Sequence, residues 1–397
     1  MSGNEKKVPK RRFKEFENEE GWEQRKVGAI ASSTYGGGTP ATANEGYWNG
    51  SIPWIQSSDL IENEVSGVIP RKHISECGLR KSATKLVPEN SIAIITRVGV
   101  GKLAFMQFPY TTSQDFLSLS KLNIDPWFGV YSCYKKLQSE LHEVQGTSIK
   151  GITKDELLEK SISVPCTNEQ KQIGKFFKNI DNIINLNQRK LEKMKALKKA
   201  YLTDMFPTEG ERKPKLRFSG FTDDWEQREV KDIFEVTRGY VLAATETTDK
   251  KTDEIPYPVY SSQTKDNGLM GYYKDFLYEN AITWTTDGAN AGTLNYRTGK
   301  FYCTNVCGVL LSDEGYANKM VSEAINNISW KHVSKVGNPK LMNNVMSKIV
   351  VSLPKTIEEQ NTISDFLNRL DNLIAIHQHK LKKLKNIKKA YLNEMFI

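Results

Sequence analysis

The chain has 397 residues, 38% of them hydrophobic and 26% charged, with a mean hydropathy of −0.52. Its longest apolar runs, such as residues 91–95 (SIAII), are far too short to cross a bilayer, which excludes a membrane-spanning protein. The N-terminal residues lack the apolar core of a secretion signal and the five cysteines are few and odd in number, so we expect a cytoplasmic protein.

The charge balance is basic, with 56 Lys and Arg against 47 Asp and Glu, a net charge of +9 and a pI of about 9.0. Such an excess favours a polyanionic partner, and nucleic acid is the usual one. A basic protein without such a partner is the alternative that charge alone leaves open.

The first predicted elements are a charged lead-in and a mixed domain. Residues 1–20 are charged and poor in apolar groups, which predicts a loosely ordered N-terminal lead-in. Residues 21–165 alternate short apolar runs with clusters of Gly, Pro, Asn and Ser, which is typical of strands joined by turns. One helix is expected near residues 127–138.

A long helix is predicted over residues 166–206. Pro165 ends the mixed domain, and Thr167 with Gln170 three residues later predicts a capping box. Apolar residues then recur mostly at spacings of three and four, which is typical of a coiled-coil stripe along a helix of roughly 55 Å. The stripe consists of Ile173, Phe176, Ile180, Ile183, Ile184, Leu191, Met194, Leu197 and Tyr201.

The second half presents the same elements in the same order. Residues 207–222 are rich in Pro, Gly and charge and predict a linker, residues 223–354 a second mixed domain, and residues 355–397 a second long helix. Thr356 and Glu359 predict its capping box. Its stripe consists of Ile363, Phe366, Leu370, Leu373, Ile374, Leu381, Leu384, Ile387 and Tyr391.

The two halves are copies of one another. Residues 198–206 (KKAYLTDMF) return almost unchanged as residues 388–396 (KKAYLNEMF), and residues 22–25 (WEQR) return as residues 225–228. The period of about 200 residues fits a whole domain followed by one long helix rather than a solenoid unit. A weaker likeness runs through both mixed domains, so we expect one architecture with diverged surfaces.

We expect the two long helices to pair antiparallel. Each stripe is too apolar to stay in water, and the nearest partner is the other helix. The second mixed domain is joined to the end of the first helix and to the start of the second, and an antiparallel pair brings those ends together. The predicted fold is mixed α/β (α+β): two similar globular domains separated by two long helices that form an antiparallel coiled coil, with a pseudo-two-fold internal repeat. Pairing of the helices between chains or onto another protein is the alternative.

No catalytic signature accompanies this framework. Residues 95–105 (ITRVGVGKLAF) lack the first glycine of a phosphate-binding loop, and Leu103 stands where Ser or Thr must bind magnesium. Cys303 and Cys307 have no second Cys or His pair to complete a zinc site, and the five histidines offer no triad. We therefore predict that the chain is not an enzyme by itself and has no cofactor or metal of its own.

Longer motifs occur in both halves of the chain. They are residues 36–40 (GGGTP), 46–60, 96–102 (TRVGVGK), 257–273 and 287–306, together with Glu-Gln near the start and KKAYLxxMF at the end of each helix. Taken together, they resemble the specificity subunit of Type I restriction-modification enzymes over nearly the whole chain. One departure is that the second domain has no GxTP motif, only residues 237–240 (TRGY), which leaves its first turn uncertain.

The resemblance implies a division of labour. Each globular domain would be a target-recognition domain that reads one half of a bipartite, asymmetric site on double-stranded DNA. The helices would set the spacing and dock two methyltransferase (modification) subunits, which use S-adenosylmethionine. Two restriction subunits, motor nucleases that need ATP and magnesium, would complete the enzyme of this host-defence system, and no membrane would take part.

The candidate DNA contacts are polar or basic residues in or near Gly-rich turns. Gly permits close backbone approach, Arg can grip guanine or phosphate, and Asn can read adenine. For each residue, a solvated surface charge or a turn former is the alternative. The DNA candidates are Arg80, Lys81, Thr96, Arg97, Gly99, Lys102, Lys265, Asn267, Asn290 and Arg297. The candidates for helix pairing and subunit docking are Ile173, Phe176, Ile180, Ile184, Leu191, Met194, Tyr201, Ile363, Phe366, Leu370, Ile374, Leu381, Leu384 and Tyr391.

Two other functions compete with this interpretation. A non-catalytic coiled-coil adaptor without direct DNA readout would need only the two stripes. A self-sufficient DNA methyltransferase or endonuclease would need catalytic motifs, and their absence from the sequence argues against it.

Overall fold

The computed structural model describes residues 7–143, 151–208, 210–263 and 265–397, without the side chains of His142, Glu143 and Lys265. The chain divides into two compact units. Unit 1 comprises residues 1–189 and 379–397, and unit 2 comprises residues 190–378. Each unit therefore joins one mixed domain to the start of one long helix and the end of the other. Every helix in the described ranges is too short or too polar to span a membrane.

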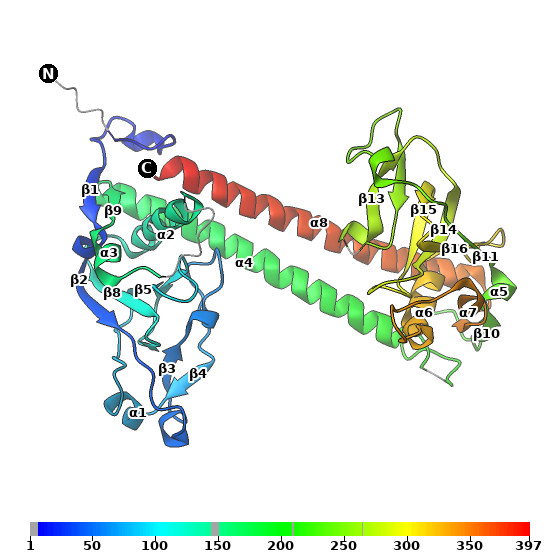
Figure 1. Ribbon diagram of the computed structural model, residues 1–397, viewed down its shortest axis with the longest axis horizontal. Coiled ribbons are helices and arrows are strands. Elements are labelled where there is room, and N and C mark those ends of the chain that lie inside the picture. Colours follow the sequence, from blue (N-terminus) through cyan, green and yellow to red (C-terminus); the bar gives the residue numbers. More distant parts are fainter. Residues whose placement is uncertain (1–6, 144–150, 209, 264) are drawn as a thin grey trace. The chain divides into compact units, whose positions relative to one another are not determined.

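Unit 1 is built on two small sheets (Figure 1). The first sheet has four antiparallel strands in the order β2 (Ala31–Gly36), β8 (Phe116–Leu122), β5 (Ser91–Ile95) and β6 (Leu103–Met106). The second has the order β4 (Lys72–Ile74), β3 (Ile52–Ile55) and β7 (Thr111–Thr112), and a separate antiparallel pair joins β1 (Glu23–Lys26) to β9 (Ser161–Val164). The helices are α1 (Glu76–Arg80), α2 (Pro126–Glu143) and α3 (Lys154–Glu159), with short turns η1 (Lys14–Phe16), η2 (Val27–Ile30), η3 (Glu45–Tyr47) and η4 (Ser57–Asp59).

The core of unit 1 lies between the four-stranded sheet and α2. All five residues of β5 are buried, which is why this strand is a continuous apolar run rather than an alternating one. Phe128 and Tyr131 of α2 pack with Phe177, and Phe396 at the end of the chain stacks on Phe128. The helix expected near residues 127–138 is confirmed as α2.

Unit 2 is built on one larger sheet. Its six strands have the order β11 (Glu235–Arg238), β16 (Cys307–Leu311), β14 (Tyr278–Thr285), β15 (Leu294–Cys303), β12 (Tyr257–Tyr260) and β13 (Leu269–Tyr273). Only the β12–β15 pairing is parallel, and β10 (Glu226–Glu229) pairs antiparallel with β17 (Val350–Leu353) as β1 does with β9. The remaining elements are α5 (Val230–Ile233), η5 (Ala244–Glu246), η6 (Lys265–Gly268), α6 (Lys319–Ser329), η7 (Trp330–His332) and α7 (Asn343–Met346).

The two long helices are α4 (Thr167–Asp204) and α8 (Ile357–Met395), and their starts differ in part from the predicted caps. α4 already includes Thr167, and the side chain of Gln170 donates to the Pro165 carbonyl at 2.8 Å instead of closing a box, so that prediction is wrong. Thr356 does precede α8, and its Oγ1 accepts from the Glu359 backbone N–H at 3.3 Å. The Glu359 carboxylate is used elsewhere, because it pairs with Arg217.

The antiparallel pairing of the long helices is confirmed within each unit. In unit 1 the ring of Phe176 lies 5.1 Å from that of Tyr391, and in unit 2 the ring of Tyr201 lies 4.9 Å from that of Phe366. These four residues occupy matching positions of the repeat, so the same contact is made twice with the roles of the helices exchanged. Such reciprocity is what a pseudo-two-fold repeat requires.

Ion pairs across the helices fix this register. Lys388 Nζ lies 2.6 Å from Asp181 Oδ1 in unit 1, and Lys198 Nζ lies 2.6 Å from Asp371 Oδ1 in unit 2. Burial by itself would raise the pKa of Asp371, but the hydrogen bond from Lys198 and the charge of Lys319 together lower it. Asn187 is buried on the seam, yet its amide donates to the Ile183 carbonyl of its own helix.

Only part of each predicted stripe is buried. Among the docking candidates Ile173, Ile184, Leu191, Ile363, Leu370 and Leu381 are buried, and the others are half-buried. Contrary to prediction, Ile183, Leu197 and Leu373 are between 45% and 48% exposed. Phe177 and Leu367, which the stripe left out, are fully buried in the cores of their domains. The seam with one partner helix is narrow, so the second apolar face of each helix packs on its own domain instead.

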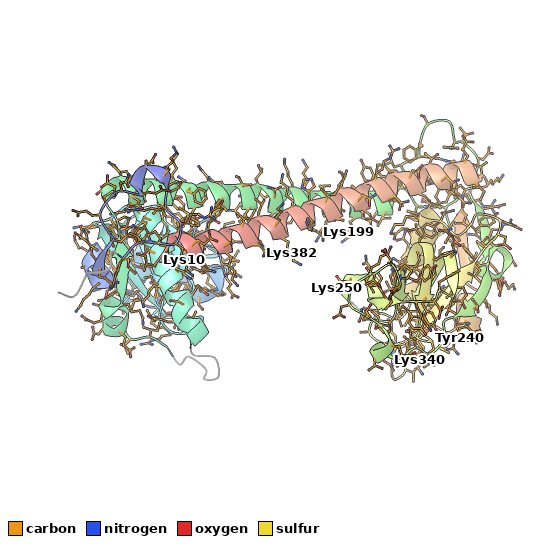
Figure 2. The ribbon with its side chains drawn as sticks, turned by 90° about the horizontal axis from the view of Figure 1, so that it is seen from above. Lys10, Lys199, Tyr240, Lys250, Lys340 and Lys382 are labelled. Atoms are coloured by element: carbon orange, nitrogen blue, oxygen red, sulfur yellow. The ribbon has the colours of Figure 1, made fainter. Side chains whose placement is uncertain are left out.

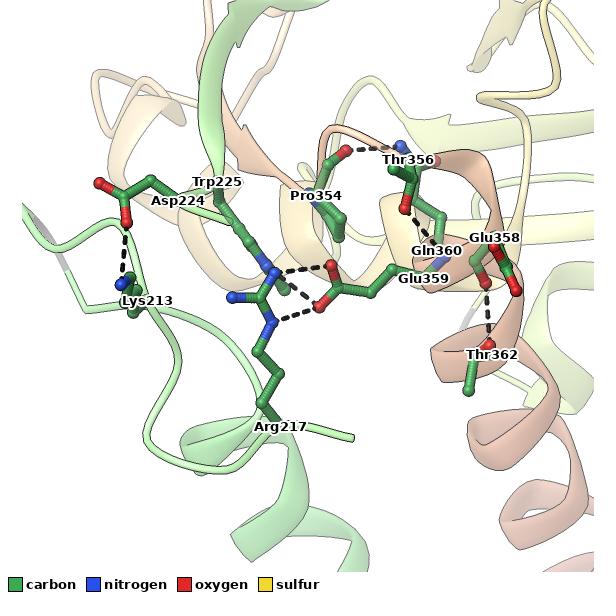
Figure 3. Close-up of polar contacts among 10 residues, drawn as sticks. All are labelled: Lys213, Arg217, Asp224, Trp225, Pro354, Thr356, Glu358, Glu359, Gln360 and Thr362. Carbon is green, nitrogen blue, oxygen red and sulfur yellow. Dashed lines mark hydrogen bonds and ion pairs between the residues drawn. The ribbon is translucent and has the colours of Figure 1, made fainter. Parts of the chain in front are cut away.

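The segments that precede β1 and β10 are docked in the same way, which differs from the expected loose lead-in. Arg12 holds Glu169 at the start of α4 with a bond of 2.7 Å, and Arg217 holds Glu359 at the start of α8 with bonds of 2.7 and 2.8 Å. Figure 3 shows the second pair, with the Trp225 indole donating to the same carboxylate at 3.3 Å. Hydrogen bonding to Glu169 raises the pKa of Arg12, and hydrogen bonding to Glu359 raises that of Arg217. Residues 1–6 of the lead-in lie outside the described residues.

Candidate nucleic-acid interface

One edge of the main sheet gathers the turns of each unit. In unit 1, β2 and β5 flank β8, and both end beside its first residues, with Gly36 opposite Leu117 and Ile95 opposite Phe116. In unit 2, β11 and β14 flank β16 and end in the same way at Arg238 and Thr285. The turns that follow these strands therefore share one edge, which we call the turn edge of each unit.

The first turn of this edge is the same in both units. A Cβ on Gly37 would lie 1.8 Å from the Ser113 carbonyl oxygen, and one on Gly239 would lie 2.1 Å from that of Cys303. The next backbone N–H donates in each case, from Gly38 to Thr112 at 2.8 Å and from Tyr240 to Cys303 at 3.2 Å. Unit 2 therefore keeps the glycine that permits close approach, although it lacks the GxTP motif. The first turn of the second domain has the same backbone arrangement as that of the first domain.

The turn between β5 and β6, residues 96–102, which we call the central turn of unit 1, contains both positioning residues and exposed ones. The Thr96 hydroxyl and backbone N–H both donate to the Asp115 carbonyl, at 3.0 and 2.7 Å, and Lys102 Nζ donates to the Leu60 carbonyl at 3.2 Å. Arg97 is exposed, and Gly99 has a φ of +92° that favours glycine. Thr96 and Lys102 therefore hold the turn in place, and Arg97 projects from it.

The other basic candidates of unit 1 lie at the end of α1. Arg80 and Lys81 are both exposed. The chain then returns to the turn edge, because Thr84 Oγ1 donates to the Thr112 carbonyl at 3.1 Å and Thr84 N lies 2.5 Å from where a Cβ of Gly38 would be. A short backbone segment thus links this basic helix end to the first turn.

In unit 2 the candidate Arg297 is buried, unlike the surface contact the sequence suggested. Its Nε donates to Thr283 Oγ1 at 3.0 Å, its Nη2 donates to the Asn267 carbonyl at 2.7 Å, and its guanidinium lies 3.7 Å from the centre of the Tyr260 ring. Burial lowers the pKa of Arg297. These contacts hold the η6 turn, in which Asn267 is exposed with a φ of +52°. The side chain of Lys265 lies outside the described part.

The last candidate, Asn290, lies in the turn between β14 and β15. Its carbonyl accepts from the Thr293 N–H at 3.0 Å, and its side chain is half-buried. Asn290 belongs to the turn edge, whereas Asn267 lies in the turn between β12 and β13, to which Arg297 of β15 is bonded. The turn that holds Asn267 also begins beside the first turn of unit 2, because the Thr304 N–H donates to the Tyr260 carbonyl at 2.9 Å and the Tyr240 N–H to the Cys303 carbonyl at 3.2 Å.

A further loop of the turn edge was missed by the sequence reasoning. Residues 333–341 lie against the β14–β15 turn, because Leu341 N donates to the Thr286 carbonyl at 2.8 Å and Gly288 N to the Pro339 carbonyl at 3.0 Å. The matching bond in unit 1 runs from Ile152 N to the Thr96 carbonyl at 2.7 Å. A signal was present, since residues 331–348 carry four lysines and no acidic residue.

Nothing in the described ranges groups three or more His, Cys, Asp or Glu side chains as a metal site would. Burial raises the pKa of the Cys303 thiol, and it raises that of Cys307 to about 11. Both thiols are therefore protonated near neutral pH and are poor nucleophiles or metal ligands. The turn edges present hydrogen-bonding and basic groups, which suit binding.

Comparisons of the sequence and of the structure with known proteins point to the same family. A family model described as the Type I restriction modification DNA specificity domain matches residues 19–196 and again residues 222–386. The specificity subunit of the Type I restriction enzyme EcoprrI of Escherichia coli is 25% identical and aligns over 85% of this chain and 84% of its own length. That of MjaIX of Methanocaldococcus jannaschii is 30% identical over 244 residues, and the match spans about half (52%) of its length. The crystal structure of a Type I restriction-modification S subunit from M. genitalium superimposes with a TM-score of 0.71 at 17% identity, over 98% of this chain and 99% of that one.

Proposed function

Since the chain belongs to the family of Type I restriction-modification specificity proteins, we propose that it is the subunit that reads the DNA sequence for such a complex. Its two target-recognition domains are residues 21–165 and 223–354, and each reads one half of a bipartite site on double-stranded DNA. The chain itself carries out no chemistry. Modification belongs to partner methyltransferase subunits that use S-adenosylmethionine, and cleavage to partner restriction subunits that use ATP and magnesium.

The observation that carries this proposal is the repeated turn edge. Both units use the same strand ends, the same close glycine and the same link to a following loop, but the side chains on them differ. Unit 1 presents Arg97 in the turn after β5, and unit 2 presents Asn290 in the turn after β14. A scaffold kept constant beneath variable polar groups suits two readers of different sequences, because base edges are distinguished by donor and acceptor patterns.

The candidate residues take two roles in this proposal. The exposed Arg80, Lys81, Arg97 and Asn267, with the half-buried Asn290, contact DNA directly. Thr96, Lys102 and Arg297 are positioning residues, because their polar groups bond the protein itself. Gly99 gives the central turn its shape, and Lys265 is assigned to DNA on sequence grounds alone.

The long helices are proposed to dock the methyltransferase subunits. In unit 1 they expose Ile183 and Leu186, at 46% and 56%, and in unit 2 they expose Leu197, Leu373 and Ile376, at 45%, 48% and 61%. Apolar side chains exposed in a row on one element suit a protein partner. The buried residues between the two helices hold the helices together, and the proposed docking surface consists of the exposed residues outside that contact.

Mapping of methylated bases across the genome, with and without this gene, tests the function. We expect a two-part motif with a fixed gap to lose its methylation when the gene is removed. A coiled-coil adaptor without DNA readout would leave the motif in place. A self-sufficient enzyme would instead give methylation or cleavage with the purified chain alone.

Alkylation of the exposed Cys77 offers a local test of the unit 1 interface. Cys77 lies on α1 three residues before Arg80, so the two side chains share one face of the helix. We expect bound DNA to slow the reaction of Cys77 with iodoacetamide several-fold, as measured by mass spectrometry. Cys166, which is exposed just before α4, is the control and should react equally with and without DNA. Equal labelling of Cys77 in both states would exclude Arg80 from the interface.

A further inference from the structure

We propose that one valine in each unit, Val98 in unit 1 and Val336 in unit 2, contacts base edges inside a groove of the DNA while the basic residue before it contacts a phosphate. The inference rests on the proposed function and deepens it. It assigns sequence reading to two apolar side chains, whereas the candidates above are polar or basic.

The two loop tips share one local design. Arg97-Val98-Gly99 and Lys335-Val336-Gly337 both place a valine between a basic residue and a glycine. Val98 is 72% exposed and Val336 is 91% exposed. The glycines have φ values of +92° and +73°, so the chain reverses directly after each valine and leaves the side chain projecting. Covering a valine typically stabilises by about 1.5–3 kcal/mol, which makes such a tip suited to being covered on binding.

Both tips stand on the turn edge. The first follows β5, whose last residue lies opposite Phe116. The second belongs to the loop of residues 333–341, which is bonded to the β14–β15 turn and closed at its base by Ser334 and Lys340, whose backbone groups bond each other at 2.8 and 3.2 Å. Because the base of this loop is paired, its tip is held out from the sheet rather than collapsed onto it.

The surroundings favour DNA over a protein as the occupant. Four lysines and no acidic residue occur between residues 331 and 348, and the carboxylate of the adjoining turn, Asp287, accepts from Asn338 at 3.1 Å. The first turn adds Tyr240, 63% exposed, and Val241, 78% exposed, and Figure 2 shows Tyr240 and Lys340 on the same side of unit 2. An apolar protein surface that accepted the valines would gain nothing from the lysines. DNA accommodates both, since phosphates take the cations and thymine methyl groups or base steps take the apolar side chain.

The test uses the full chain and a pool of randomised duplexes from which the wild-type protein first selects its motif. We expect Val98→Ser to relax base preference in one half of that motif and Val336→Ser in the other half. Each change should weaken binding of the selected duplex about tenfold and leave binding of an unrelated duplex within about twofold. Lys335→Gln should weaken the binding of both duplexes. It should also reduce the slope of the binding constant against salt concentration, on logarithmic scales, by about 1, as expected for the loss of one phosphate contact.

Matched controls are Ile69→Ser in unit 1 and Val350→Ser in unit 2, because these side chains are 77% and 46% exposed outside the turn edge. Both should select the wild-type motif. Val336→Thr, which keeps the side-chain shape, replaces the serine variant should that variant fail to fold.

Valine variants that select the same motif with wild-type affinity would overturn this inference alone. Variants that read DNA normally but no longer co-purify with methyltransferase subunits would also overturn it, by assigning the tips to a protein. A wild-type chain that selects no motif at all would instead contradict the proposed function, and this inference would fail with it.

Discussion

Replacing Glu359 with alanine is expected to destabilise unit 2 by about 3–5 kcal/mol, because it leaves a buried cation without its partner. The side chains of Arg217 and Glu359 are only 14% and 3% exposed, and the carboxylate accepts two bonds from the guanidinium and one from the Trp225 indole. Hydrogen exchange read by mass spectrometry should show lost protection in peptides covering residues 212–230 and the start of α8. Peptides of the unit 1 sheet should keep their protection.

The control for this change is Glu159→Ala in unit 1. Glu159 pairs with Lys26 at 2.5 Å, but the two side chains are 67% and 59% exposed, so the loss should be below about 1 kcal/mol. The double variant Arg217→Met with Glu359→Met should recover much of the stability, since apolar residues of similar volume need no partner. Unchanged exchange in Glu359→Ala would show that the pair does not hold the segment before β10.

Replacing Gly37 with alanine is expected to cost about 1–3 kcal/mol in unit 1 and to weaken DNA binding on the order of tenfold. The new Cβ would lie 1.8 Å from the Ser113 carbonyl oxygen, which is backbone and cannot swing aside. The first turn must then move away from Thr112 and Ser113, and the turn edge loses its shape. Binding of the selected duplex and the urea midpoint together measure the effect.

The neighbouring Gly36 supplies a matched control. A Cβ there meets nothing within 4 Å and its φ is not positive, so Gly36→Ala should leave both stability and DNA binding unchanged. Gly239→Ala should reproduce the Gly37 effect in unit 2, where the Cβ would lie 2.1 Å from the Cys303 carbonyl oxygen. If Gly37→Ala bound the selected duplex as tightly as Gly36→Ala, the first turn would not shape the DNA interface.

The repeated features of the chain could be predicted because the amino-acid sequence contains each of them twice. The long helices, their antiparallel direction and the mixed domains follow from apolar spacing and from how the second domain is tethered. The partners of individual residues could not be obtained in this way. Gln170 and Glu359 were expected to cap their helices, yet they bond the Pro165 carbonyl and Arg217, which a local pattern does not contain.

The candidate site divides in the same manner. The glycine-rich sequence indicated the central turn of unit 1, and Arg97 in it is exposed as expected. Arg297 has the residue type of a DNA contact, but the sheet turns it inward over Tyr260. The loop of residues 333–341 was passed over, because its place beside the β14–β15 turn depends on backbone bonds between segments about fifty residues apart.

By itself the sequence determined the kind of protein: a doubled body with two long helices and a basic charge balance, because periodicity, charge and motif spacing are local properties of the chain. Only the tertiary structure showed that Gly239 occupies the same position in unit 2 as Gly37 in unit 1. It also showed that Arg12 and Arg217 bind the first turns of the long helices. Val98 and Val336 lie on the turn edges of their units only because of the tertiary structure. Strand order and backbone packing create those neighbourhoods, and each one joins residues that are far apart along the chain.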